Sequence, residues 1–196
     1  MADLEKLRKN LADRGFASSC FETAAKAAEY LDGKLDGRVI GFGGSMTLLD
    51  MGLYEKLHTH NTVYWHWRNG TLAQAKSAEV YISSLNGVAE TGELINIDGT
   101  GNRISATVFG PEKVYYVIGV NKIAPDFDSA LWRARNIASP KNAQRLNRKT
   151  PCAVKGDKCY DCKSPERICR VLTVFWEKPT SFKEVELVIV NQNLGF

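Results

Sequence analysis

Short apolar runs alternate with helical segments along most of this chain, and this alternation is the feature that most constrains its fold. Runs rich in β-branched and aromatic residues, typical of buried strands, lie at 38–42, 62–65, 79–84 and 113–120. Helical spacing is clear near the start, where Leu4, Leu7 and Leu11 recur at intervals of three and four. The alternation predicts an α/β fold, with a Rossmann-like, mostly parallel sheet and helices on both faces.

The remaining elements are expected from the same patterns. Helices are predicted at 3–14, 22–31, 45–58, 71–77 and 126–148, the last interrupted near Ser139-Pro140. Residues 93–97 and 104–109 predict paired strands around a turn at 98–102. Runs at 170–176 and 186–190 are expected to close the sheet.

The composition is that of an ordinary globular protein. The chain has 196 residues, of which 44% are hydrophobic and 24% charged, so one domain spanning 1–196 with a substantial core is expected. The first residues contain no apolar signal segment, and no apolar run has the length of a membrane span. A cytoplasmic protein is therefore expected, and thiols in that compartment stay reduced.

Four of the five cysteines lie in a predicted loop at 150–170. Cys152, Cys159, Cys162 and Cys169 have the spacing C-x6-C-x2-C-x6-C. Two thiolates on a tight turn, completed by two flanking thiolates, can hold Zn2+ or an iron–sulfur cluster. Reduced structural thiols and disulfides are alternatives that the spacing leaves open. Cys20 lies apart in a short predicted strand, where we expect a small buried side chain.

Positive charge is concentrated around these cysteines. Residues 133–170 contain eleven Lys or Arg and three acids, a net charge of +8, whereas the whole chain carries +4. The rest of the chain is therefore acidic. A basic region suits an anionic partner, or offsets the charge of a metal–thiolate cluster, although a plain solvated surface has the same composition. The sequence has no nucleic-acid motif and few interleaved aromatic residues, so no nucleic-acid partner is expected.

A glycine loop is the first candidate ligand site. Gly43, Gly44 and Ser45 follow the strand at 38–42 and open a helix. Glycine permits a ligand to approach the backbone closely, and free N–H groups favour an anion there. The loop matches neither the dinucleotide-binding fingerprint nor the phosphate-binding P-loop, and a tight turn without ligand is the alternative.

Further candidates lie in the segments that follow the strand at 79–84. Glu90 is the candidate catalytic residue, because a carboxylate in a glycine-flanked loop can act as base, nucleophile or ligand anchor. Asn86 can donate a hydrogen bond to a carboxylate or carbonyl. Asp98, Asn102 and Arg103 supply acceptors and a guanidinium fork that suits a small carboxylate or phosphate. The alternatives are that Glu90 is an ordinary loop acid and that the segment around Asp98 is a plain turn.

Several of these stretches also occur together in a known family. They are Glu90–Glu93, Asn96–Arg103 and Phe109–Pro111, with Gly43–Ser45, Val117–Ile123, Arg135-Asn136 and Leu194–Phe196. These stretches, which extend over nearly the whole chain, resemble the lactate-utilisation (LUD) domain family. This family was formerly a domain of unknown function, and it includes the LutB and LutC proteins. The resemblance implies a fold related to sugar-phosphate isomerases and coenzyme A transferases. It also implies a role in oxidising L-lactate to pyruvate with iron–sulfur or redox protein partners.

The chain departs from the family pattern at its cysteines. It lacks the Cys-x2-Cys-x2-Cys repeats of the LutB type and carries a cysteine loop that LutC-type proteins need not have. It therefore resembles a short stand-alone member, whose substrate can differ from lactate.

Three functional hypotheses follow. In the first, the chain is a redox accessory or subunit in the oxidation of L-lactate or another small 2-hydroxy acid, with a metal or iron–sulfur site at the cysteines and a small anionic substrate near Arg103. In the second, it is a non-redox transferase or isomerase that uses Glu90 and contains structural zinc. In the third, it is a non-catalytic ligand-binding or assembly module. The family resemblance favours the first.

Overall fold

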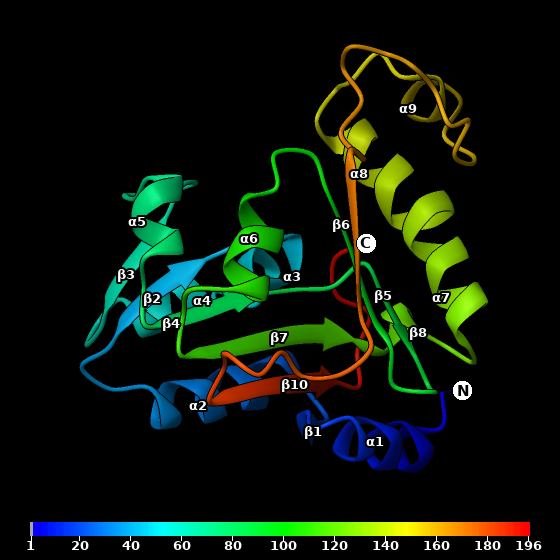
Figure 1. Ribbon diagram of the computed structural model, residues 1–196. Coiled ribbons are helices and arrows are strands. Elements are labelled where there is room, and N and C mark those ends of the chain that lie inside the picture. The colour runs from blue at the N-terminus through cyan, green and yellow to red at the C-terminus, as the bar shows by residue number, and fades with distance from the viewer. Residues whose placement is uncertain (1) are drawn as a thin grey trace.

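A six-stranded parallel sheet forms the body of the protein in the computed structural model, which describes residues 2–196 (Figure 1). The order across the sheet is β1 (Ala17–Phe21), β10 (Glu184–Val190), β7 (Lys113–Gly119), β4 (Val80–Ser83), β2 (Val39–Phe42) and β3 (Thr62–Trp65). Every pairing in it is parallel. The predicted Rossmann-like α/β fold is confirmed.

Helices cover both faces of this sheet, because its strands carry apolar side chains on both sides. One face is covered by α2 (Ala24–Lys34), α3 (Met46–Asp50) and α4 (Leu53–Leu57), and the other by α1 (Leu4–Asp13), α5 (Leu72–Lys76) and α6 (Asn102–Val108). In strand β7, successive side chains point to opposite faces of the sheet. Tyr115 and Val117 belong to one core cluster, whereas Val114 and Tyr116 belong to the other.

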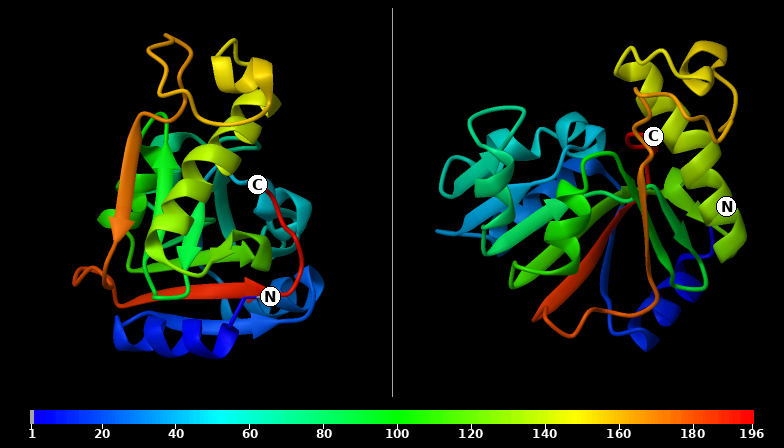
Figure 2. Two further views of the ribbon diagram at one scale, coloured as in Figure 1. Left: turned by 90° about the vertical axis from the view of Figure 1, so that its right-hand side faces the viewer. Right: turned by 45° about the horizontal axis from the view of Figure 1, so that its top comes forward.

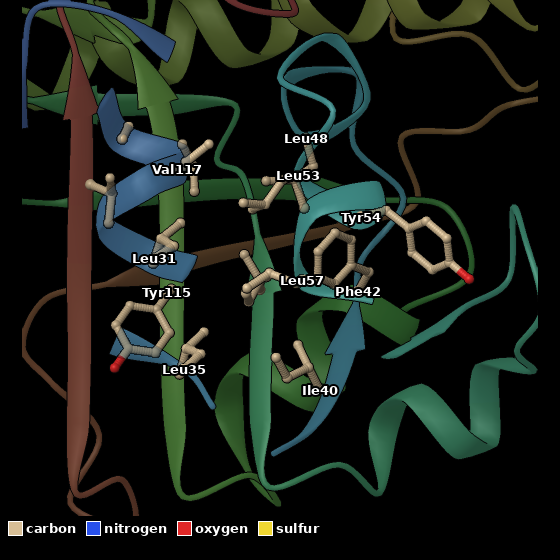
Figure 3. Close-up of a cluster of buried hydrophobic side chains, with 14 of the residues drawn as sticks. Leu31, Leu35, Ile40, Phe42, Leu48, Leu53, Tyr54, Leu57, Tyr115 and Val117 are labelled. Atoms are coloured by element: carbon tan, nitrogen blue, oxygen red, sulfur yellow. The ribbon is translucent and has the colours of Figure 1, made fainter. Parts of the chain in front are cut away.

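Leucines from three helices fill the first core (Figure 3). Leu31 of α2, Leu48 of α3 and Leu57 of α4 are fully buried in one cluster with Phe42 and Val117. Burial of each such side chain stabilises the fold by about 1.5–3 kcal/mol. This packing fixes the strands, and with them the loops that leave their carboxyl ends.

A smaller mixed sheet stands beside the main one, and it contains the strands predicted at 93–97 and 170–176, although a separate sheet was not predicted. Its order is β8 (Ile123–Ala124), β5 (Gly87–Ala89), β6 (Leu94–Asp98) and β9 (Val171–Phe175), with β6 antiparallel to both neighbours. Helix α7 (Phe127–Arg133), the π-helix η2 (Ala134–Ala138) and α8 (Ser139–Arg145) form one rod along it (Figure 1). Ile95 and Ile97 pack there with Ala130 and Ala134.

The cysteine-bearing segment extends from the far end of this rod (Figure 2). Helix α9 (Pro151–Lys155) packs on α8, and the chain then runs without helix or strand until β9. Within residues 2–196, no helix has the length and apolar character needed to cross a membrane.

The strand predicted at 104–109 is wrong, because these residues lie almost entirely in helix α6. The Asp98 carboxylate accepts hydrogen bonds from the backbone N–H groups of Gly99, Thr100 and Arg103, which turns the chain into a helix instead of a hairpin. Ala106 is then buried in the second core. Tertiary packing therefore outweighs the local β-propensity of this segment.

Other expectations are corrected as well. Strand β10 lies inside the main sheet and β9 belongs to the small sheet, so the two do not close one sheet together. The helix predicted at 45–58 is two helices, since Gly52 adopts a left-handed φ of 61° between them. Pro140 does not interrupt its helix, because the widened turns of η2 precede it. Cys20 is exposed, since β1 is an edge strand.

Candidate functional site

A cavity of about 370 Å3 opens at the carboxyl ends of β2 and β4. Strand β3 lies on one side of β2, and β4, the next strand of this sheet in the sequence, lies on the other side. The strand order therefore reverses between β2 and β4. Open α/β sheets bind ligands at such a point. Of the predicted ligand contacts, the lining includes Gly44, Ser45, Asn86, Asp98, Asn102 and Arg103. The structure therefore brings together residues that lie far apart in the sequence.

The glycine loop follows β2 and shapes one wall of the cavity. Gly43, which does not line the cavity itself, donates its N–H to the Ile82 carbonyl at 2.9 Å, and a Cβ there would lie 2.5 Å from the Ser83 hydroxyl. A Cβ on Gly44 would lie 3.2 Å from His66. Ser45 caps α3, with its hydroxyl accepting from the Leu48 N–H at 3.3 Å. The glycines thus permit close packing at the cavity wall.

Arg103 lies next to the glycine loop and is fixed in the cavity wall by its contacts with β6. Its Nη2 donates to the Ile97 carbonyl at 2.7 Å, and its Nε lies 3.5 Å from the Asp98 carboxylate. Asp98 is itself held by three backbone N–H groups, so the pair is rigid. The Nη1 group of Arg103 has no hydrogen bond within residues 2–196 and is available to a ligand.

Lys122 lines the same cavity as Arg103, although it is not among the candidates predicted from the sequence. It ends the 3-10 turn η1 (Val120–Lys122) after β7 and is 4% exposed. Its Nζ donates to the hydroxyls of Ser84 at 2.8 Å and Thr47 at 2.9 Å, and all three residues line the cavity. Burial, followed by the charge of Arg133 and then of Arg103, lowers the pKa of Lys122 to about 7. Its position directly after a buried strand was the available signal.

The remaining wall comes from aromatic and basic side chains. Arg145 of α8 reaches across to Trp67, with its guanidinium carbon 5.2 Å from the centre of the ring, and Arg148 also lines the cavity. The pKa of His66 is lowered, first by desolvation and then by Arg103. Asp98 is the only Asp or Glu side chain that lines the cavity within the described chain, so the side chains around the cavity favour an anion.

Comparison with known proteins identifies the family. The model of the LUD domain matches residues 4–190. The chain belongs to the LUD domain family. No curated protein matches this LUD domain in a sequence search.

A solved structure agrees with the fold of this LUD domain. A crystal structure of a DUF162 family protein from Deinococcus radiodurans superposes with a TM-score of 0.55, at 13% identity and with 96% of each chain covered. A structure of eIF2B beta from Chaetomium thermophilum gives a TM-score of 0.37 at 16% identity, over 54% of this chain and 44% of that one. The first comparison supports the architecture alone, and the second is too weak to support an argument.

Glu90 lies outside the cavity of the LUD domain. Its carboxylate accepts from the Asp3 backbone N–H at 2.9 Å and lies 3.3 Å from the Lys6 Nζ. Its backbone carbonyl accepts from the Asn10 amide. These contacts attach α1 to the end of β5, so the structure does not bring Glu90 together with the other predicted site residues.

The oxygen atoms of Asn86 are occupied within the LUD domain. Its side-chain Oδ1 accepts from the Ile97 N–H at 2.7 Å, and its backbone carbonyl accepts from Arg133 Nη1 at 2.6 Å. Arg133 is buried and also donates to the Asn121 carbonyl, whereas Arg135 points toward Cys159. Arg133 therefore holds the loops at Asn86 and Asn121, whereas Arg135 lies at the cysteine segment.

The four clustered cysteines of the LUD domain line one narrow cavity. They are Cys152, Cys159, Cys162 and Cys169, and all are free thiols. Arg135 and Arg167 line the same cavity. Burial raises the pKa of the Cys169 thiol, an effect that Arg167 opposes. Within residues 2–196, no three metal-binding side chains are already grouped around a common point.

Proposed function

We propose that this LUD domain binds a small carboxylate in the cavity between β2 and β4 and acts as a subunit or accessory in the oxidation of lactate or a related 2-hydroxy acid. The family is associated with lactate utilisation, and the chain belongs to it. The observation that carries the substrate class is the fixed Arg103 guanidinium, which shares with Lys122 a cavity where Asp98 is the only Asp or Glu side chain within residues 2–196.

The chemistry of a 2-hydroxy acid matches these groups. A carboxylate is the natural partner of a guanidinium with unused N–H groups. A hydroxyl or carbonyl on the adjacent carbon can hydrogen-bond with Lys122 and Ser84, which line the same cavity as Arg103. Asp98 is neutralised by Arg103 and by backbone N–H groups, so it does not oppose an entering anion.

Ligand binding tests this proposal. We expect L-lactate and pyruvate to bind the purified domain in ligand-observed NMR, and each to displace the other. Propane-1,2-diol, which has the same carbon skeleton as lactate but no carboxylate, is expected not to bind. Equal signals for the diol and for lactate would contradict a carboxylate site.

We also propose that the cysteine segment takes up a thiophilic metal, either a zinc ion or an iron–sulfur cluster. Four thiols around one cavity are the donor set that both groups use, and Arg135 and Arg167 would offset the negative charge of the thiolates. The thiols are not yet grouped as a metal site, so binding would draw the segment 156–170, which has no helix or strand, closer together. A cluster would supply electron transfer, and zinc would supply structural support.

Anaerobic purification with metal analysis distinguishes these outcomes. We expect stoichiometric zinc, or iron with sulfide and broad visible absorption, in the wild type, and loss of the metal in Cys159→Ser. Cys20→Ser is the matched control, because Cys20 is exposed on an edge strand outside the cysteine segment. Metal-free wild-type protein, or metal retained in Cys159→Ser, would overturn the proposal.

A further inference from the structure

A buried lysine that forms no ion pair within residues 2–196 lines the cavity. Lys122 forms no ion pair within residues 2–196, and its Nζ is hydrogen-bonded instead to the neutral hydroxyls of Thr47 and Ser84. A buried ammonium normally has a carboxylate beside it, because an unpaired buried charge is strongly destabilising. The arrangement is therefore suited to a neutral amine.

Charged groups around Lys122 reinforce this state. Arg133 of α7 and Arg103 of α6 both disfavour a positive charge on Nζ, and Asp50 of α3 opposes them more weakly. The pKa of about 7 follows from burial and these charges, so a large fraction of the amine is neutral near pH 7. A neutral lysine amine in a ligand cavity is a nucleophile.

We infer that Lys122 is a nucleophilic amine that forms an imine with the carbonyl carbon of a 2-oxo acid held by Arg103 in this cavity. The nitrogen lone pair attacks the carbonyl carbon and forms the C–N bond. The carbonyl oxygen then leaves as water with two protons from the amine, and a C=N bond remains. The step requires no oxidant or reductant.

The hydroxyls beside Lys122 can assist this step. The Ser84 and Thr47 oxygens lie 2.8 and 2.9 Å from Nζ, and Ser84 also donates to Thr47 at 3.3 Å. They can relay the proton that passes from nitrogen to the leaving oxygen. The inference rests on the proposed function, since the carboxylate of the same ligand must bind at Arg103.

Reductive trapping tests the imine. The intact domain is incubated with pyruvate and sodium cyanoborohydride near pH 7, and the modified lysines are located by peptide mass spectrometry. We expect a mass increase equal to pyruvic acid less one oxygen, at Lys122 at least about tenfold faster than at any other lysine, because ordinary lysines are almost fully protonated at this pH. Lys122→Met is expected to lose this adduct, and Lys149→Met, which removes an exposed lysine, to keep it.

Parallel NMR measurements separate this inference from the proposed function. L-lactate has no carbonyl at the second carbon, so its binding reports the carboxylate site alone. Lactate and pyruvate binding without an adduct at Lys122 would overturn the imine and leave the carboxylate site standing. An adduct spread evenly over many lysines would overturn it too. Absence of both binding and adduct would overturn both proposals.

Discussion

Replacing Arg103 with methionine is expected to weaken lactate and pyruvate binding by about 10- to 100-fold, because a hydrogen bond to a charged group contributes about 1.5–3 kcal/mol. Arg103 is 15% exposed, its Nε is next to Asp98, and its Nη1 group is free to meet the ligand carboxylate. Methionine keeps an unbranched apolar side chain in this wall and removes only the guanidinium. Isothermal titration of each variant with L-lactate measures the change.

The fold should survive this substitution. Asp98 keeps its hydrogen bonds from the backbone N–H groups of Gly99, Thr100 and residue 103, so the start of α6 is still capped. Arg8→Met is the matched control, since Arg8 is exposed on α1 and lies outside the cavity. Equal lactate affinity in Arg103→Met and Arg8→Met, with both proteins folded, would remove Arg103 from the site.

Gly41→Ala is expected to lower the free energy of unfolding by about 3 kcal/mol or more, which is at the upper end for overpacking a core. A Cβ on Gly41 would lie 1.9 Å from the Ala75 carbonyl oxygen and 2.7 Å from its carbon. Both are backbone atoms of α5, so no side chain can rotate away, and α5 must move off strand β2. Urea unfolding followed by circular dichroism measures the loss.

Gly33→Ala provides the contrast within the same protein. Gly33 lies in α2, and a Cβ there meets nothing within 4 Å. Alanine is a better helix former than glycine, so this variant should gain about 0.5–1 kcal/mol. If Gly41→Ala were as stable as Gly33→Ala, the close packing of α5 on β2 would be wrong.

The main sheet could be predicted from the sequence because its strands carry a strong local signal. Strands such as β7 are buried on both faces and are therefore continuously apolar, and each is followed by glycine or polar residues. Two strands of the small sheet have no such signal. Strand β8 has two residues and β5 has three, and both are stabilised by pairing with each other and by packing against α7.

The sequence predicts those parts of the candidate site that lie in loops with glycine or with charged residues. Gly44 and Ser45 follow a predicted strand, and Arg103 follows a turn, so their types and positions suggested a ligand. Lys122 gave a weaker signal, its position after a predicted strand, because only the fold shows that it is buried and forms no ion pair within residues 2–196. Glu90 shows the opposite case: its loop resembles a catalytic one, but its partners belong to α1.

A crystal structure of the domain with L-lactate or pyruvate would show directly whether Arg103 and Lys122 hold the ligand. We expect ligand density in the cavity between β2 and β4, with the carboxylate on Arg103 and the adjacent oxygen, or an imine carbon, at Lys122. Density bound elsewhere, or a carboxylate that turns away from Arg103, would contradict the proposed carboxylate site.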